Sequence, residues 1–177
     1  MTDVMTPAQR SAAMAQIRGK NTGPEKLVRR ALWAAGLRFR LHERSLPGKP
    51  DIVLKKWGAV VLIHGCFWHR HIGCRLFRFP ATRTDFWEPK LQRNALRDAD
   101  QITKLVGLGW RVLIVWECAI RFDPIHTEAR ILTWIRTNQL SAQLSARAGT
   151  LTETPLEHAE ETNRASTRLV STPETNG

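Results

Sequence analysis

The sequence of 177 residues predicts an α/β protein with a mixed central β-sheet flanked by helices. Three short apolar runs rich in β-branched residues, at 51–54, 60–63 and 110–116, predict buried strands. Segments with apolar residues at steps of three and four lie before and between these runs and predict helices. The order of the elements, two helices, three strands, a loop, a helix, a strand and a helix, implies a mixed sheet with helices on its faces.

Two helices and a strand are predicted in the first part of the chain. A Thr-Pro start and an Ala-rich stretch predict a helix over residues 7–17. A second helix is predicted over residues 24–35, because a proline opens it, its apolar residues recur with helical spacing, and Gly36 ends it. Residues 37–41 alternate apolar and polar side chains, which predicts a half-exposed strand before a turn at 46–50.

The following elements complete the predicted sheet and cover it. Residues 51–54 and 60–63 are near enough in sequence to form a hairpin. A long helix is predicted over residues 84–105, with glycines shortly after it. Residues 110–116 are apolar except for one arginine and predict a buried central strand, and a last helix is predicted over residues 124–135.

The charge is distributed unevenly along the chain. The sequence holds 27 Lys and Arg against 16 Asp and Glu, a net charge of +11, which favours a polyanion as the partner. Residues 138–177 carry 3 basic and 5 acidic side chains and are rich in Ser, Thr and Ala, which predicts a flexible tail without catalytic residues. Residues 1–137 carry the other 24 basic and 11 acidic side chains and are predicted to form one domain.

The sequence shows no sign of membrane insertion or of secretion. Its apolar runs are far shorter than the about 20 residues that a membrane-spanning helix requires, and its amino terminus lacks a signal-peptide pattern. Three cysteines cannot all pair with one another, so we expect a cytoplasmic protein whose thiols are available for a metal. A Walker-type phosphate-binding loop is absent from the sequence, so an ATP-driven mechanism has no support.

Cysteine and histidine are concentrated in residues 64–74, and the third cysteine directly follows the predicted central strand. A structural zinc ion takes four thiolate or imidazole ligands. A complete set of such ligands is Cys66, His71, Cys74 and Cys118. Single cysteines are also ordinary core residues, but a set that uses every cysteine favours zinc. Because the four positions of the ion are then filled, the zinc would hold a loop, and His64 and His69 remain for another role.

Acidic residues upstream of this cluster point to a second metal. Asp51 begins the predicted hairpin and Glu25 lies on the helix before it. Metal-dependent nucleases of the restriction-endonuclease type open their site with such a carboxylate, which holds Mg²⁺ at the start of a strand. Their next strand usually carries an acid and, two positions later, a lysine. Residues 62–64 here read Leu-Ile-His, so the acid is missing and His64 stands where the lysine would be.

Four longer strings make the pattern specific. They read LPGKPD at 46–51, HGCFWH at 64–69, PATRTDFW at 80–87 and GWRVLIVWEC at 109–118. With these strings the chain closely resembles the very short patch repair (Vsr) DNA mismatch endonucleases, from about residue 10 to residue 135. The resemblance implies a restriction-endonuclease-like core that carries a structural zinc loop, and it leaves the predicted tail uncovered.

The resemblance implies an activity and a biological setting. The enzyme would nick double-stranded DNA on the 5′ side of the thymine in a T·G mismatch, which arises when 5-methylcytosine deaminates. The nick starts the replacement of that thymine, which links the enzyme to a cytosine-5 DNA methyltransferase and to a downstream repair polymerase. The chain is expected to act as a monomer in the cytoplasm, associated with the nucleoid through DNA.

The resemblance also assigns roles to single residues. Asp51 is expected to bind Mg²⁺ directly, and the backbone carbonyl of Ile63 is expected to be a second ligand. His69 resembles the general base that activates water, since histidine titrates in a suitable range, and Asp98 resembles its carboxylate partner. The two residues expected to order water at the metal are Glu25 and His64.

Aromatic and basic side chains are expected to contact the DNA. Phe67 and Trp68 lie inside the zinc loop, and the resemblance implies that they wedge between base pairs beside the mismatch, together with Met14 of an N-terminal helix. Basic residues would bind phosphates and set the salt dependence of binding. These residues are Arg10, Arg18, Lys20, Arg75, Arg78, Arg83 and Arg93.

Each of these residues also has an ordinary structural explanation when it is taken alone. Glu25 lies near a helix start, where an acid is favoured, and Asp51 follows a proline in a turn. His64, Phe67 and Trp68 could be core residues. Two other functions fit parts of the pattern, namely a restriction-type nuclease that cuts intact DNA and a zinc-stabilised DNA-binding module without catalysis. A T·G duplex compared with its T·A control separates the first, and a response to Mg²⁺ separates the second.

Overall fold

The computed structural model describes residues 9, 21–137 and 139–156, which form a mixed five-stranded sheet. The strands lie in chain order across the sheet, from β1 to β5. Their bounds are β1 (Ile52–Leu54), β2 (Ala59–His64), β3 (Arg111–Trp116), β4 (Ala142–Arg147) and β5 (Thr150–Pro155). Strand β3 is central and parallel to both neighbours, whereas β1–β2 and β4–β5 are antiparallel pairs. The predicted mixed α/β fold is confirmed.

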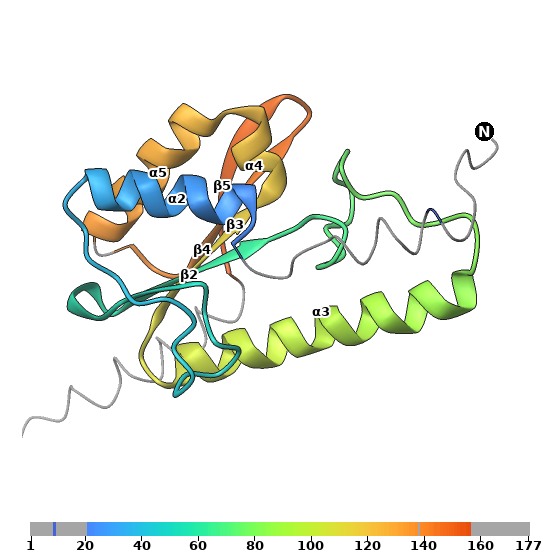
Figure 1. Cartoon of the computed structure of the whole chain (residues 1–177), viewed down its shortest axis with the longest axis horizontal. Helices are drawn as coiled ribbons and strands as arrows, with labels where there is room; N and C mark the ends of the chain where they lie inside the picture. Colours follow the sequence, from blue (N-terminus) through green and yellow to red (C-terminus); the bar gives the residue numbers. More distant parts are fainter. Residues whose placement is uncertain (1–8, 10–20, 138, 157–177) are drawn as a thin grey trace, which may run out of the picture.

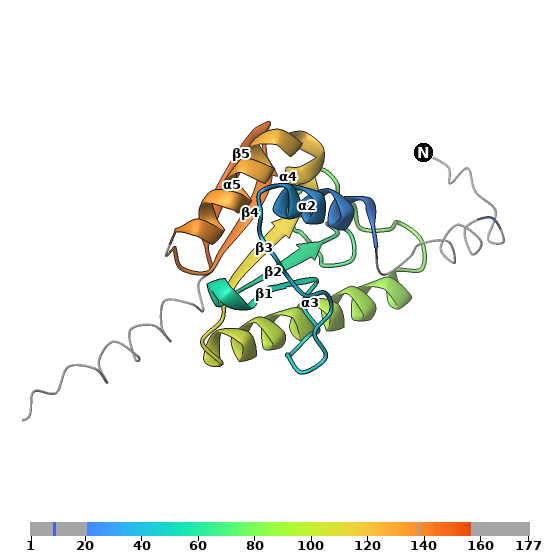
Figure 2. The same ribbon diagram turned by 60° about the vertical axis from the view of Figure 1, so that its left-hand side comes forward.

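Helices cover the two faces of the sheet unequally. Helices α2 (Gly23–Ala34), α4 (Glu117–Phe122) and α5 (Pro124–Arg136) lie on one face, and α3 (Thr84–Gly107) crosses the other (Figures 1 and 2). Residues of β3 alternate between the two layers, with Leu113 and Val115 packed toward α2 and α5, and Val112 and Ile114 packed toward α3. Both faces of the central strands are therefore buried, as expected for parallel strands. None of the described helices is long and apolar enough to cross a membrane.

The parallel pairing of β2 with β3 fixes where the functional loops lie. His64 at the end of β2 lies beside Trp116 at the end of β3. The loop after β2 and the start of α4 therefore leave the same edge of the sheet. This edge brings residues 65–74 close to Cys118, although more than forty residues separate them in the sequence.

Most of the predicted helices are found, and their ends follow the expected capping rules. Thr22 and Glu25 form a reciprocal capping box at the start of α2, and Gly36 after the helix has a φ of +78°. Helix α5 starts at Pro124, with the Asp123 carboxylate accepting a hydrogen bond from the backbone N–H of His126. Helix α4, over residues 117–122, was not predicted. The predicted helix 7–17 and Met14 lie outside the described residues, Gln9 excepted.

The predicted strand at 37–41 is wrong except for one bridge. Arg40 exchanges two backbone hydrogen bonds with Val53, and the N–H of His42 donates to the carbonyl of Pro50, but the Arg40–Val53 bridge is isolated and no strand forms. His42 has a φ of +49°, which turns the chain out of the extended conformation directly after this bridge. The alternation of apolar and polar side chains therefore did not suffice to form a strand at residues 37–41, because β1 offers only three residues for pairing.

The structure also contradicts the flexible tail predicted from residue 138, over residues 142–155. Strand β4 continues the sheet beside β3, with Ala142 and Leu144 buried. Ala148 and Gly149 both have positive φ values, +47° and +75°, which is the two-residue turn that suits a twisted hairpin, and β5 returns from it. The polar composition of this hairpin reflects a sheet face that no described helix covers. The packed domain therefore extends to Leu156, and residues 157–177 lie outside the described part of the chain.

Candidate active site and metal centre

A cavity of about 580 Å³ opens at the edge where β2 and β3 end. It is lined by side chains from the start of α2, the residues before β1, the end of β2, the loop after it, and α3. All six residues predicted for catalysis and Mg²⁺ binding line this cavity: Glu25, Asp51, Ile63, His64, His69 and Asp98. The fold thus brings together residues that span more than seventy positions of the sequence.

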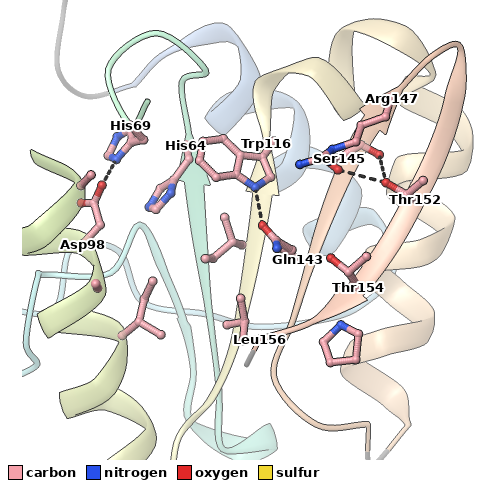
Figure 3. A pocket seen from close by; sticks show the side chains of 15 residues that line it. His64, His69, Asp98, Trp116, Gln143, Ser145, Arg147, Thr152, Thr154 and Leu156 are labelled. Atoms are coloured by element: carbon pink, nitrogen blue, oxygen red, sulfur yellow. Dashed lines mark hydrogen bonds and ion pairs between the residues drawn. The ribbon is translucent and has the colours of Figure 1, made fainter. Parts of the chain in front are cut away.

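His69 and Asp98 form the closest polar pair in this cavity. Nδ1 of His69 lies 2.6 Å from Oδ2 of Asp98, which joins the loop after β2 to α3 (Figure 3). A carboxylate on Nδ1 fixes the orientation of the ring and leaves Nε2 available to exchange a proton. The pair therefore has the arrangement of a general base held by a carboxylate.

His64 lies directly against His69. Their rings stack with centroids 3.9 Å apart and an interplanar angle of 6°. Burial lowers the pKa of His64 well below its usual range, and the proximity of His69 and His71 lowers it further. His64 is therefore a neutral imidazole that supports the ring of His69 without adding a positive charge to it.

Asp51 is positioned by the backbone of the neighbouring strand. Its Oδ2 accepts a hydrogen bond of 2.8 Å from the N–H of Ile63. Burial raises the pKa of Asp51 and the charge of Glu25 raises it further, while the hydrogen bond from Ile63 and the positive charge of Arg29 act in the opposite direction. A cation stabilises the ionised form of a buried carboxylate, so Asp51 is suited to bind a divalent metal ion.

Glu25 is held chiefly by its own helix end. Its carboxylate accepts hydrogen bonds from the backbone of Asn21 and Thr22 and forms an ion pair of 2.5 Å with Arg29. Although Glu25 and His64 line the same cavity, the hydrogen bonds of Glu25 go to residues 21–29 and not to His64. A water shared by the two residues stays a prediction.

Sequence reasoning missed several residues around this cavity. Arg29 bridges Glu25 and the Nε2 atom of His42, which is 3.3 Å away, and the Nδ1 atom of His42 lies 3.9 Å from Asp51. Glu117 directly follows β3, and its carboxylate accepts a hydrogen bond of 3.3 Å from the N–H of Cys66. An acid at the end of a buried central strand was a visible signal for Glu117, whereas nothing in the sequence linked Arg29 to His42.

The predicted zinc ligands form a compact cluster beside the cavity. Cys66, His71, Cys74 and Cys118 are all buried, and their ligand atoms all lie within 4.8 Å of one another. The Sγ atoms of Cys66 and Cys118 lie 3.5 Å and 3.6 Å from Nδ1 of His71. Three sulfurs and one imidazole nitrogen form a donor set that suits a structural zinc ion.

Backbone groups around the cluster favour thiolates. The N–H of Leu76 donates to Sγ of Cys74, and the N–H of Ala146 donates to Sγ of Cys118. A hydrogen bond shared with Cys66 and the hydrogen bond with His71 lower the pKa of Cys118, and the same contact with Cys118 together with burial raises the pKa of Cys66. Because a thiolate is the form that binds a metal, the cluster can hold a metal ion.

Trp116 lies between the cluster and the cavity. Its indole stacks on His71 with centroids 4.0 Å apart, and its ring meets His64 edge-on at 5.2 Å. Its Nε1 donates a hydrogen bond of 2.9 Å to Gln143 of β4. The indole thus contacts a predicted zinc ligand, a predicted active-site residue and the hairpin that the sequence analysis missed.

Phe67 and Trp68, in the loop after β2, are half-buried and lie above the start of α3. Phe67 and Trp68 pack against each other and against Trp87, and Phe86 packs on Trp87. The Nζ atom of Lys90 lies 5.1–5.7 Å from three of these rings. Neither Phe67 nor Trp68 belongs to the buried core, which leaves both accessible to a ligand.

Comparison with known proteins identifies the family. The family model described as DNA mismatch endonuclease Vsr matches residues 2–75. The chain is 45% identical over 152 residues to DNA mismatch endonuclease Vsr of Escherichia coli (strain K12), a match that covers 83% of this chain and 96% of that protein. It is 48% identical over 131 residues to Type II nicking enzyme V.XorIIP of Xanthomonas oryzae pv. oryzae (strain KACC10331 / KXO85), covering 74% of this chain and 95% of that protein. Because this identity spans most of both chains, the chain belongs to the Vsr family of DNA mismatch endonucleases, which hydrolyse DNA.

Proposed function

We propose that the enzyme uses Mg²⁺ to nick double-stranded DNA on the 5′ side of the thymine in a T·G mismatch, which starts very short patch repair. The observation that carries this proposal is the convergence of Asp51 and the His69–Asp98 pair on one cavity. Half-buried aromatic residues lie beside the same cavity, on a loop that the cysteine cluster ties to the sheet.

In this proposal Asp51 and the backbone carbonyl of Ile63 bind Mg²⁺, which supplies positive charge to the attacked phosphate. His69 accepts the proton of the attacking water at Nε2, and Asp98 stabilises the resulting positive charge through Nδ1. His64 supports the ring of His69 by stacking. Glu25 would order water at the metal from the start of α2, where Arg29 fixes its carboxylate.

Phe67 and Trp68 would provide the preference for damaged DNA. Inserting aromatic rings between base pairs costs unstacking energy of a few kcal/mol per step, and a mismatched step costs less to open than a paired one. Met14, outside the described residues, would insert from the N-terminal segment. We propose zinc as the ion of the cysteine cluster, because it would hold these two rings in position relative to Asp51.

The biological setting completes the proposal. A T·G mismatch arises where 5-methylcytosine has deaminated, so the substrate depends on a cytosine-5 DNA methyltransferase, and the nick must be used by a repair polymerase. We propose that the enzyme does this work as a monomer in the cytoplasm, on the DNA of the nucleoid.

A nicking assay on labelled duplexes tests the proposal. One duplex carries a single T·G pair and the other carries T·A at the same position, and both are incubated with Mg²⁺ and with a chelator. We expect Mg²⁺-dependent nicking beside the thymine of the T·G duplex and little nicking of the T·A duplex. Equal cleavage of both duplexes would instead indicate a nuclease that acts on intact DNA.

A matched pair of histidine variants shows whether the reaction belongs to this cavity. His69→Ala removes the proposed base, and we expect a loss of at least about 100-fold in rate. His126→Ala removes a histidine of α5 that pairs with Asp123 at 2.7 Å, away from the cavity, and should leave the rate unchanged. Similar rates for the two variants would reject His69 as the base.

A further inference from the structure

A second cavity, also of about 580 Å³, adjoins the candidate active site. It lies between α3 and the exposed face of β4 and β5, as Figure 3 shows. His64, His69 and Asp98 line both cavities, so a ligand that leaves the active site along this edge enters the second cavity directly. We name this second cavity the hairpin groove.

The shape of the hairpin groove follows from its two walls. Its helical wall carries Ala95 and Ala99 beside Asp98, and these small side chains leave room above the sheet. Its opposite wall is polar and belongs to the β4–β5 hairpin. The volume lies within the range of small-molecule sites, which is sufficient for one unit of a DNA strand.

Two side chains of the hairpin groove, Gln143 and Arg147, offer hydrogen-bond donors to a ligand. The indole N–H of Trp116 has no acceptor capacity, so its bond to Gln143 fixes Oε1 of the amide and leaves the amide NH₂ for another acceptor. Arg147 is exposed at the rim, and none of the ion pairs found among the described residues involves it.

Three acceptor side chains of the groove already have partners. Asp98 is paired with His69, and the hydroxyls of Ser145 and Thr152 bond to each other at 3.0 Å. A groove that presents an amide NH₂ and an unpaired guanidinium, with its carboxylate occupied, favours an anionic ligand with several acceptor oxygens. A phosphodiester has this chemistry, and the DNA substrate supplies it next to the active site.

We propose that the hairpin groove binds the backbone of the DNA strand that is cut, with Gln143 and Arg147 donating hydrogen bonds to a phosphate adjacent to the one at Asp51. This proposal rests on the proposed function in taking DNA as the ligand and Asp51 as the position of the attacked phosphate. It gives a role to the β4–β5 hairpin, which the composition of the chain did not indicate.

Binding measurements without Mg²⁺ test the groove separately from the reaction. Fluorescence anisotropy is recorded with the T·G duplex and with the T·A duplex between about 50 and 200 mM salt. Loss of one phosphate contact lowers the slope of log K against log salt by about 0.9, which corresponds to about eightfold weaker binding at 0.1 M salt. We expect Arg147→Gln to show this change equally on both duplexes, and Arg147→Lys to restore the slope.

Two further variants make the test specific. Gln143→Glu keeps an acceptor for Trp116 but replaces the donor by a negative oxygen, so it should weaken binding at least as much as Arg147→Gln. Arg136→Gln is the matched control, because Arg136 ends α5 near the start of β3, at the opposite end of the sheet. Melting temperatures confirm that each variant is folded.

The outcomes separate the groove from the proposed function. An unchanged slope for Arg147→Gln, or the same change for Arg136→Gln, would overturn the proposal. Tighter binding of DNA by either groove variant would also overturn the proposal. It would indicate that the groove holds another part of the chain in competition with DNA. Failure of mismatch-specific nicking would leave these binding results intact and would affect the proposed function alone.

Discussion

Replacing Arg111 by Met tests how the start of the central strand is held. Arg111 is the single basic residue of β3, and its guanidinium donates five hydrogen bonds to backbone carbonyls. The acceptors are the carbonyls of Trp57, Trp134, Ile135, Thr137 and Gln139. The side chain therefore joins the β1–β2 hairpin to the last turn of α5, where helix carbonyls lack partners in the helix.

The expected loss of stability follows from these contacts. The bonds to Trp57, Trp134 and Ile135 are partly buried, whereas water can replace the other two. At about 1 kcal/mol for each partly buried bond, Arg111→Met should lower the free energy of unfolding by about 3 kcal/mol. In a protein of this size that corresponds to a decrease of about 6–12 °C in melting temperature.

Urea and thermal unfolding of matched variants check this value. Arg38→Met is the control, because Arg38 lies 4.0 Å from the ring of Trp33, as Arg111 lies 4.7 Å from the ring of Trp134, but makes one exposed hydrogen bond to a carbonyl. It should lower the free energy of unfolding by less than about 1 kcal/mol. If Arg111→Met unfolds within about 2 °C of the unmodified protein, the five bonds do not hold the strand and the reasoning is refuted.

Four further predictions concern the metal-binding residues and the hairpin. Asp51→Ala should abolish nicking and keep binding of the T·G duplex within about tenfold, because a metal ligand is lost and not a DNA anchor; substantial cleavage by this variant would reject Asp51 as a ligand. Because burial raises the pKa of Asp51 above its unfolded value, the ionised carboxylate destabilises the metal-free protein at neutral pH, so Asp51→Asn should raise the melting temperature there. This gain should fade as the pH falls through the raised pKa toward about 4, and a gain that persists at lower pH would contradict it. Cys118→Ser should release zinc, lower the melting temperature and weaken nicking, whereas His69→Ala should keep one zinc per chain, as measured by mass spectrometry. The opposite metal contents would contradict the assignment of His71 to the zinc and of His69 to the active site. Removal of residues 141–177 should prevent folding, since β4 covers the edge of β3; a cooperative thermal transition in that variant would show that the hairpin is dispensable.

The sequence was most informative where local signals agree with the tertiary structure. Pro24 and Gly36 mark the ends of α2 because helix termini obey local rules. The ligand set that includes Cys118 was visible because cysteine is rare in this chain and follows a clearly apolar strand. The pairing of Asp98 with His69 required the family resemblance, since Asp98 lies on a polar helix that offers other acids.

The remaining features depend on long-range contacts that leave little local trace. The β4–β5 hairpin has few large apolar residues, because one of its faces is open and lines the groove. Ala148 and Gly149 were its clearest local signal, although alanine is unusual in such a turn. Arg111 interrupts an apolar strand for a reason that only the fold reveals, namely the carbonyls of α5. Arg29 and His42 meet across thirteen positions, which no periodicity indicates.

The contacts of the Trp116 indole determine how the enzyme would respond to a different metal ion in the cysteine cluster. His64 and His71, near the two ends of the loop, both contact the indole of Trp116. This one side chain therefore fixes the loop at two points. An ion of a different radius in the cysteine cluster would shift His71 along the indole and tilt His64, instead of unfolding the loop. Because His69 stacks on His64, we expect a protein reloaded with such an ion to keep its melting temperature and to lose rate.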